Sequence, residues 1–147
     1  MKCTYSLDIN APADRVFEYL RDPELMKQWL QGLEETRYLG DYDPARPLGA
    51  RFRQKIREGG RVKEYDGEVT AFAPPKHLGV RLFSPQFSVQ VDYHLTPVGD
   101  GTRLDYSADV TCNHWFIRLV ARLFSFFMKG MLRKQLAKLK ELAEGGT

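Results

Sequence analysis

The sequence contains few of the residue groupings that identify an enzyme by inspection. Its two cysteines, Cys3 and Cys112, are far apart in the chain, and its three histidines have no spacing typical of metal ligands or catalytic sets. Gly59-Gly60 and Gly99-Asp100-Gly101 separate alternating segments, so they indicate hairpin turns rather than phosphate-binding loops. The sequence therefore predicts no cofactor and no metal site.

The chain also lacks a strong excess of one charge and a long hydrophobic run. It has 22 Lys and Arg against 19 Asp and Glu, whereas nucleic-acid binding requires clustered, uncompensated positive charge. The apolar segment 115–128 contains two arginines and is shorter than the roughly 20 residues that a transmembrane helix needs. Residues 1–9 have no signal-peptide pattern. We therefore expect a cytoplasmic protein with reduced cysteines and no nucleic-acid partner.

The periodicity of the chain predicts one domain, residues 1–147, with a sizeable core. Residues 3–9 alternate as in a half-buried strand, and two short helices are expected after Asn10-Ala11-Pro12 and after Asp22-Pro23. A period near 2 then indicates about six antiparallel strands. Among them are the segments 51–57, 62–72, 77–83, 87–95 and 104–110.

The last third of the sequence predicts one long helix that ends at Ala143. At 100° per residue, one apolar stripe stays on the same side of it. The stripe consists of Ile117, Val120, Ala121, Phe124, Met128, Met131, Leu132, Leu139 and Leu142. A curved antiparallel sheet with one apolar face needs a cover, and only this helix is long enough. The predicted fold class is α+β: a curved antiparallel sheet of about seven strands wrapped around a long C-terminal helix, with two short helices after the first strand.

A second apolar set lies outside this stripe, in the first half of the helix only. It consists of Trp115, Phe116, Leu119, Leu123, Phe126 and Phe127. These side chains either pack against the short helices or form a contact surface. With Arg118 and Arg122 nearby, such a surface would suit transient membrane contact or a homodimer.

Several motifs accompany this order of elements. They are the segment Ile9 to Phe17 with its Ala11-Pro12-Ala13, Asp22-Pro23 with Trp29, Gly67-Glu68-Val69 through Pro74-Pro75, and the ending Leu136 to Lys140. The chain thereby resembles the START-like superfamily, and most closely its polyketide cyclase/dehydrase and lipid-transport (SRPBCC) branch. The resemblance implies a helix-grip fold with a cavity between sheet and helix. It also makes the first and last strands neighbours, which would bring Cys3 and Cys112 close enough for a disulfide.

The inward residues of the strands, closed by the helix, are the predicted ligand-binding residues. They are Tyr5, Leu7, Phe52, Gln54, Ile56, Phe87, Val89, Val91, Tyr93, Leu104, Tyr106, Phe124, Met128, Met131 and Leu132. An alternating strand looks the same over a filled core as over a cavity, so both remain open. The polar groups of Tyr5, Gln54, Tyr93 and Tyr106 need partners on this apolar face, and a cavity with water or ligand would supply them.

Catalytic residues are only weakly indicated. His77, His94 and His114 are scattered, and Asp92 shares the outward face of its strand with His94. The acid/base candidates are Tyr5, Glu64, Tyr93 and Tyr106. Glu64 lies in an acidic row with Asp66 and Glu68, which would pair across the hairpin with the basic row from Arg51 to Arg57 on an outer face.

The sequence therefore favours the non-catalytic binding or transport of an apolar small molecule of lipid, quinone or polyketide type. The ligand would lie between the sheet and the C-terminal helix. One alternative is a polyketide cyclase or dehydratase-type enzyme that uses the same cavity. A second is a protein-interaction module that acts through the apolar face of the helix.

Overall fold

The computed structural model describes residues 2–30, 32–40, 43, 45–58, 60–83, 87–112 and 115–145, without the side chains of Glu58, Phe87, Cys112 and residues 115–129. The elements in chain order are β1 (Lys2–Ile9), α1 (Ala13–Arg21), α2 (Pro23–Trp29), β2 (Leu33–Leu39), β3 (Arg51–Glu58), β4 (Arg61–Ala73), β5 (His77–Phe83), β6 (Phe87–Val98), β7 (Gly101–Cys112) and α3 (Trp115–Gly145). This order confirms the predicted α+β fold class.

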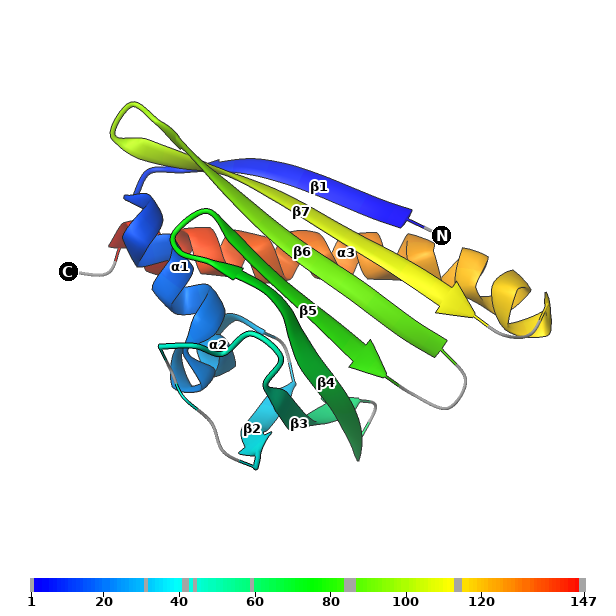
Figure 1. The fold of residues 1–147 in the computed structure, drawn as a ribbon. Coiled ribbons are helices and arrows are strands. Elements are labelled where there is room, and N and C mark those ends of the chain that lie inside the picture. Colours follow the sequence, from blue (N-terminus) through cyan, green and yellow to red (C-terminus); the bar gives the residue numbers. More distant parts are fainter. Residues whose placement is uncertain are drawn as a thin grey trace.

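The strands form one antiparallel sheet in the order β1-β7-β6-β5-β4-β3-β2. Each strand from β2 to β7 is a neighbour of the next, and β1 pairs with β7, as the resemblance implied. Figure 1 shows α3 running along one face of the sheet, with α1 and α2 at the end where α3 terminates. We call the sheet face toward α3 the inner face and the opposite one the outer face.

Strand β2 is the one strand that the sequence pattern did not locate. Its residues Leu33 to Leu39 include two adjacent glutamates, Glu34 and Glu35, which break a simple alternation. The pairing with β3 shifts between Leu33 and Glu35, as expected for a bulge. A bulge changes the phase of the inward residues, so a strict period of 2 does not reveal the strand.

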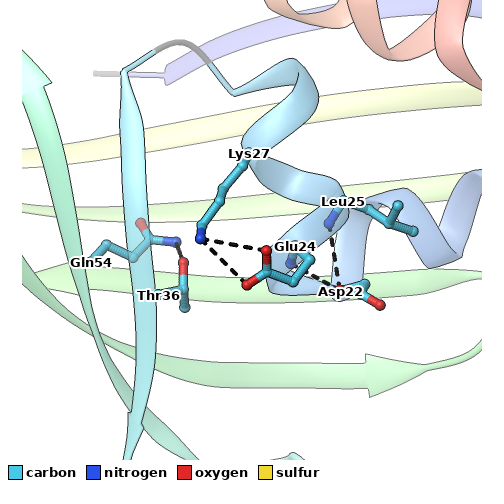
Figure 2. A network of polar contacts seen from close by, with 6 residues as sticks. All are labelled: Asp22, Glu24, Leu25, Lys27, Thr36 and Gln54. Atoms are coloured by element: carbon cyan, nitrogen blue, oxygen red, sulfur yellow. Dashed lines mark hydrogen bonds and ion pairs between the residues drawn. The ribbon is translucent and has the colours of Figure 1, made fainter.

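The two short helices begin in different ways, and only α2 has a side-chain cap. The carboxylate of Asp22 accepts from the backbone N–H groups of Glu24, at 2.9 Å, and Leu25, at 3.5 Å (Figure 2). Because Pro23 occupies the first turn and has no N–H to satisfy, Asp22 caps α2 efficiently. Helix α1 begins differently: Pro12 is its N-cap and no side chain caps it.

The C-terminal half of α3 supplies the centre of the core. Leu136, Leu139 and Ala143 are at most 1% exposed and pack in one cluster with buried inner-face side chains such as Leu104. The buried stripe runs through Leu132, Leu136 and Leu139. Met131, which the periodicity also assigned to the stripe, is 40% exposed and is not part of this core cluster.

The register of β1 and β7 separates the two cysteines. Cys3 lies opposite Ala108, whereas Cys112 lies four positions further along β7 and opposite Phe87 of β6. Four strand residues span about 13 Å, well beyond the roughly 7 Å between Cα atoms that a disulfide permits. The expected closeness of Cys3 and Cys112 is therefore wrong, and Cys3 is a free thiol.

Candidate functional site

Three tyrosines form a row across the inner face. Tyr5 of β1 lies opposite Tyr106 of β7, which in turn lies opposite Tyr93 of β6. The rings of Tyr93 and Tyr106 are 5.3 Å apart and meet edge to face, which is a favourable aromatic geometry. Antiparallel register thus gathers residues from three strands that are distant in sequence.

Burial determines the protonation of the two inner tyrosines. Desolvation of the buried phenol, with a smaller contribution from Tyr106, raises the pKa of Tyr93 well above its ordinary value. Desolvation also raises the pKa of Tyr106 to about 12. Both side chains therefore keep their protons near neutral pH and can donate a hydrogen bond.

The hydroxyls of Tyr93 and Tyr106 form no hydrogen bond with any group in the described part of the chain. In that same part, every fully buried side-chain nitrogen or oxygen has a partner. The two hydroxyls are therefore not fully enclosed by the described residues. A core filled completely by apolar side chains would leave them buried and unpaired, which is costly.

Helix α2 adds an indole to this aromatic group. The ring of Trp29 meets that of Tyr93 edge to face at 6.3 Å. Its Nε1–H donates to the backbone carbonyl of Tyr19 in α1 at 2.8 Å, which settles the orientation of the indole. Asp22, as the cap of α2, thereby helps to position a ring at the edge of the tyrosine row.

A second polar pair lies on the inner face of β2 and β3. The buried Gln54 donates from Nε2 to Oγ1 of Thr36 at 3.3 Å, across the strand pair (Figure 2). Gln54 is therefore satisfied by a protein partner, unlike the two tyrosine hydroxyls. On α2, Lys27 pairs with Glu24 at 3.3 Å.

A cavity of about 90 Å³ opens between the edge strand β1 and α3. Cys3, Thr4 and Tyr5 line it from the strand, and Leu132 and Arg133 line it from the helix. This volume is below the roughly 300–1,000 Å³ typical of small-molecule pockets. Tyr5, which also belongs to the tyrosine row, is one of the residues that line this cavity.

The structure places most of the predicted binding residues on the inner face. Those whose side chains are described there are Tyr5, Leu7, Phe52, Gln54, Ile56, Val89, Val91, Tyr93, Leu104 and Tyr106, with Leu132 packed beside them from α3. The side chains of Phe87, Phe124 and Met128 lie outside the described part of the chain. So do all those of the predicted contact surface: Trp115, Phe116, Leu119, Leu123, Phe126 and Phe127.

Glu64 lies away from the inner face. It is exposed on β4 opposite Lys55, and its neighbour in the acidic row, Asp66, accepts a hydrogen bond from Arg53 Nε at 2.8 Å. The Arg53 hydrogen bond holds the pKa of Asp66 below its ordinary value. Arg53 and Asp66 thus form the predicted cross-strand ion pair on the outer face, whereas Lys55 pairs with Glu35 and Arg57 with Glu34, both on β2.

Two histidines that appear scattered in the sequence are direct neighbours in the sheet. His77 of β5 lies opposite His94 of β6, and the rings stack at 4.1 Å with an angle of 16° between their planes. Nε2 of His77 lies 2.8 Å from Oδ1 of Asp92. One ligand atom of each of these three residues lies within 4.8 Å of the others. The sequence-based prediction of no metal site did not anticipate this cluster, because its members come together across strands and not through their spacing along the chain.

The fold and the inner face together define an α+β helix-grip protein whose sheet presents tyrosines toward a long C-terminal helix. A family model described as polyketide cyclase / dehydrase and lipid transport matches residues 1–144, and the chain belongs to this family. Membership in this family suggests that the protein binds a hydrophobic ligand. No helix in the described residues is long and apolar enough to cross a membrane.

Solved structures confirm the fold over the whole chain. Protein TTHA0849 from Thermus thermophilus is 18% identical, with a TM-score of 0.78 over 100% of this chain and 99% of the other. Protein MLL2253 from Mesorhizobium loti is 22% identical, with a TM-score of 0.74 and the same coverage. At these identities the likeness shows the fold alone. No curated protein matches the sequence.

Proposed function

We propose that this protein binds or transports an apolar small molecule of lipid, quinone or polyketide type between the inner face and α3, without catalysing its conversion. The observation that carries the proposal is the pair of tyrosine hydroxyls, on Tyr93 and Tyr106, that find no partner in the described part of the chain. Family membership supports the apolar character of the ligand.

The surroundings of the hydroxyls suit a mostly apolar ligand with an oxygen. Leu104 and Val91 flank the tyrosine row in the register of β6 and β7, and both are buried. Apolar walls with a few convergent polar groups are the usual composition of a small-molecule site. Because Tyr93 and Tyr106 are protonated, they would donate to a carbonyl or ether oxygen of the ligand.

The same features weigh against the cyclase or dehydratase alternative. A general base must lose its proton near neutral pH, and burial raises the pKa of Tyr106 to about 12. Among the inner-face strand positions whose side chains the structure describes, none carries Asp or Glu, and Glu64 is on the outer face. A carboxylate hydrogen-bonded to a tyrosine, which would favour acid/base catalysis, is absent from these strand positions.

Native mass spectrometry of freshly purified protein, compared with the denatured sample, tests the proposal directly. We expect a co-purified mass that is lost on denaturation and that extraction assigns to an apolar compound. Binding of 1-anilinonaphthalene-8-sulfonate, followed by its fluorescence, gives a second measurement for protein that has lost its ligand. The proposal would be contradicted if the native protein had only its sequence mass and also left the fluorescence of the dye unchanged.

Single substitutions then test the tyrosine row. Tyr93→Phe and Tyr106→Phe should each weaken binding of the extracted compound by about 2- to 10-fold, since each removes one hydrogen-bond donor. Tyr38→Phe is the matched control, because Tyr38 lies on β2 at the opposite edge of the sheet from β1. Equal affinities in all variants would exclude the tyrosine hydroxyls as ligand contacts but would not contradict ligand binding between the sheet and α3.

A further inference from the structure

The outer face of β5 and β6 carries a cluster that the proposed function does not use. We propose that His77, Asp92 and His94 bind one divalent transition-metal ion, with Zn²⁺ as the best-suited candidate. One ligand atom of each residue already lies within 4.8 Å of the others. His77 and Asp92 are about a quarter exposed at the side chain, and His94 is exposed, so an ion can enter from solvent.

The strand register brings the two imidazoles as close as a sheet allows. The backbone N–H of Leu95 donates to the carbonyl of Lys76 at 2.7 Å. His77 and His94 are the next pair along the ladder and therefore form a non-hydrogen-bonded pair, in which facing side chains are closest. The pairing holds both rings on the same face with no need for a loop.

The carboxylate of Asp92 is also held in place by its neighbours. Gly79 lies opposite Asp92, and a Cβ at Gly79 would come within 2.7 Å of Oδ1 of Asp92. Glycine weakens a strand interior and often marks the close approach of another group. Gln90 Nε2 lies 3.5 Å from Oδ2 of Asp92 and donates to Oγ1 of Thr70 at 2.8 Å. The carboxylate thus lies across the backbone of β5, beside His77.

Two imidazoles and one carboxylate are a known ligand set for zinc and other divalent transition metals, with further positions left to water. Ligand atoms bound to one Zn²⁺ are about 3.3 Å apart, so the widest separation in the cluster must close by up to about 1.5 Å. The stacked rings must also turn for their nitrogens to converge. His94 is exposed and can change rotamer, whereas His77 is held beside Asp92 at 2.8 Å.

Charges around the cluster favour a cation on balance. Asp105 of β7 lies opposite His94 and adds a second carboxylate on the same face. Arg103 partly offsets it, since its Nε donates to Asp105 Oδ1 at 3.2 Å. Tyr93 follows Asp92 in β6 and points to the inner face. A bound ion would therefore join β5 and β6 without contacting an inner-face ligand, so this site stands independently of the proposed function.

Isothermal titration calorimetry with zinc chloride tests the site, using metal-stripped full-length protein without an affinity tag. We expect one Zn²⁺ per chain, with an increase in melting temperature because the ion binds only the folded state. His77→Ala, His94→Ala and Asp92→Asn should each weaken binding by more than about tenfold. Co²⁺ in place of Zn²⁺ should give visible absorption bands that the two alanine variants lack.

His114→Ala is the matched control, because it removes the remaining histidine of the chain. It should bind zinc as the wild type does. His94→Ala changes an exposed side chain, so circular dichroism without metal should show an unchanged fold. The proposal would be overturned if the wild type bound no zinc. It would also be overturned if His77→Ala and His94→Ala bound zinc as tightly as the wild type does.

Discussion

At the residue scale, two strand glycines make room for particular neighbours. Gly79 accommodates the Asp92 carboxylate on the outer face, and Gly67 accommodates the ring of Phe52 on the inner face. A Cβ at Gly67 would overlap that ring, and Phe52 itself is buried. Neither requirement is visible in the sequence, because the partner lies on another strand.

Gly67→Ala should therefore destabilise the protein although alanine is the better strand former. We expect a loss of about 1–3 kcal/mol in the free energy of unfolding, measured with urea, since the Phe52 ring must leave its position. In a Phe52→Leu background the same substitution should cost less, because the smaller side chain can yield. An equal cost in both backgrounds would assign the effect to the backbone and not to the ring.

Thr102 makes a buried hydrogen bond that its type of side chain does not predict. It is 2% exposed, and its Oγ1 donates to the carbonyl of Ala11 at 2.7 Å. Thr102→Val should lower the free energy of unfolding by about 1–2 kcal/mol, because the carbonyl loses its partner. Thr96→Val, at an exposed position on β6, is the control and should change little. Equal unfolding midpoints for the two variants would contradict this role.

At the element scale, a small polar cluster attaches the end of α3 to the start of the chain. Lys140 Nζ donates to the carbonyl of Asp8 at 2.9 Å and pairs with Glu144. Glu144 in turn accepts from the backbone N–H of Asn10 at 2.7 Å. The hydrogen bond from Lys140, and then that from Asn10, hold the pKa of Glu144 below its ordinary value.

Because of this cluster, we expect the free energy of unfolding to depend on pH. Because the pKa of Glu144 is lower in the folded than in the unfolded chain, the carboxylate stabilises the fold above its unfolded pKa, near 4.5. That contribution is lost as the pH falls through the folded pKa. Glu144→Gln should cost about 0.5 kcal/mol at pH 7 and almost nothing at pH 3, as urea unfolding at both values would show. A constant difference between variant and wild type would contradict the titration of Glu144.

The elements themselves were predictable to different degrees. Alternation located β1 and β6, and Asp22-Pro23 located the start of α2, because these signals depend only on local geometry. The bulge in β2 interrupts its alternation, and the apolar periodicity did not show that Met131 is 40% exposed. A periodic pattern identifies a face of a helix but not its edge, where the curvature of the sheet decides which side chains are covered.

At the scale of the whole molecule, strand order and register decide which distant residues meet. They separate Cys3 from Cys112, although the strands that carry these two residues are neighbours. Thiol labelling of the denatured protein without reductant should therefore add two labels per chain. A chain that takes up label only after reduction would contradict this register. Cys3→Ser provides the control and should take up one label fewer.

The sequence by itself determined the fold class, the family resemblance and the alternation that puts Tyr5, Tyr93 and Tyr106 on the inner face. Local periodicity and capping are properties of short segments, so they can be recognised before folding. The tertiary structure alone decided that the three tyrosines form one row and that His77 meets Asp92 and His94. The two-residue period of a strand shows which face of the sheet a side chain occupies. The register between strands decides which side chains become neighbours, and it depends on hairpin geometry and on packing over the entire sheet.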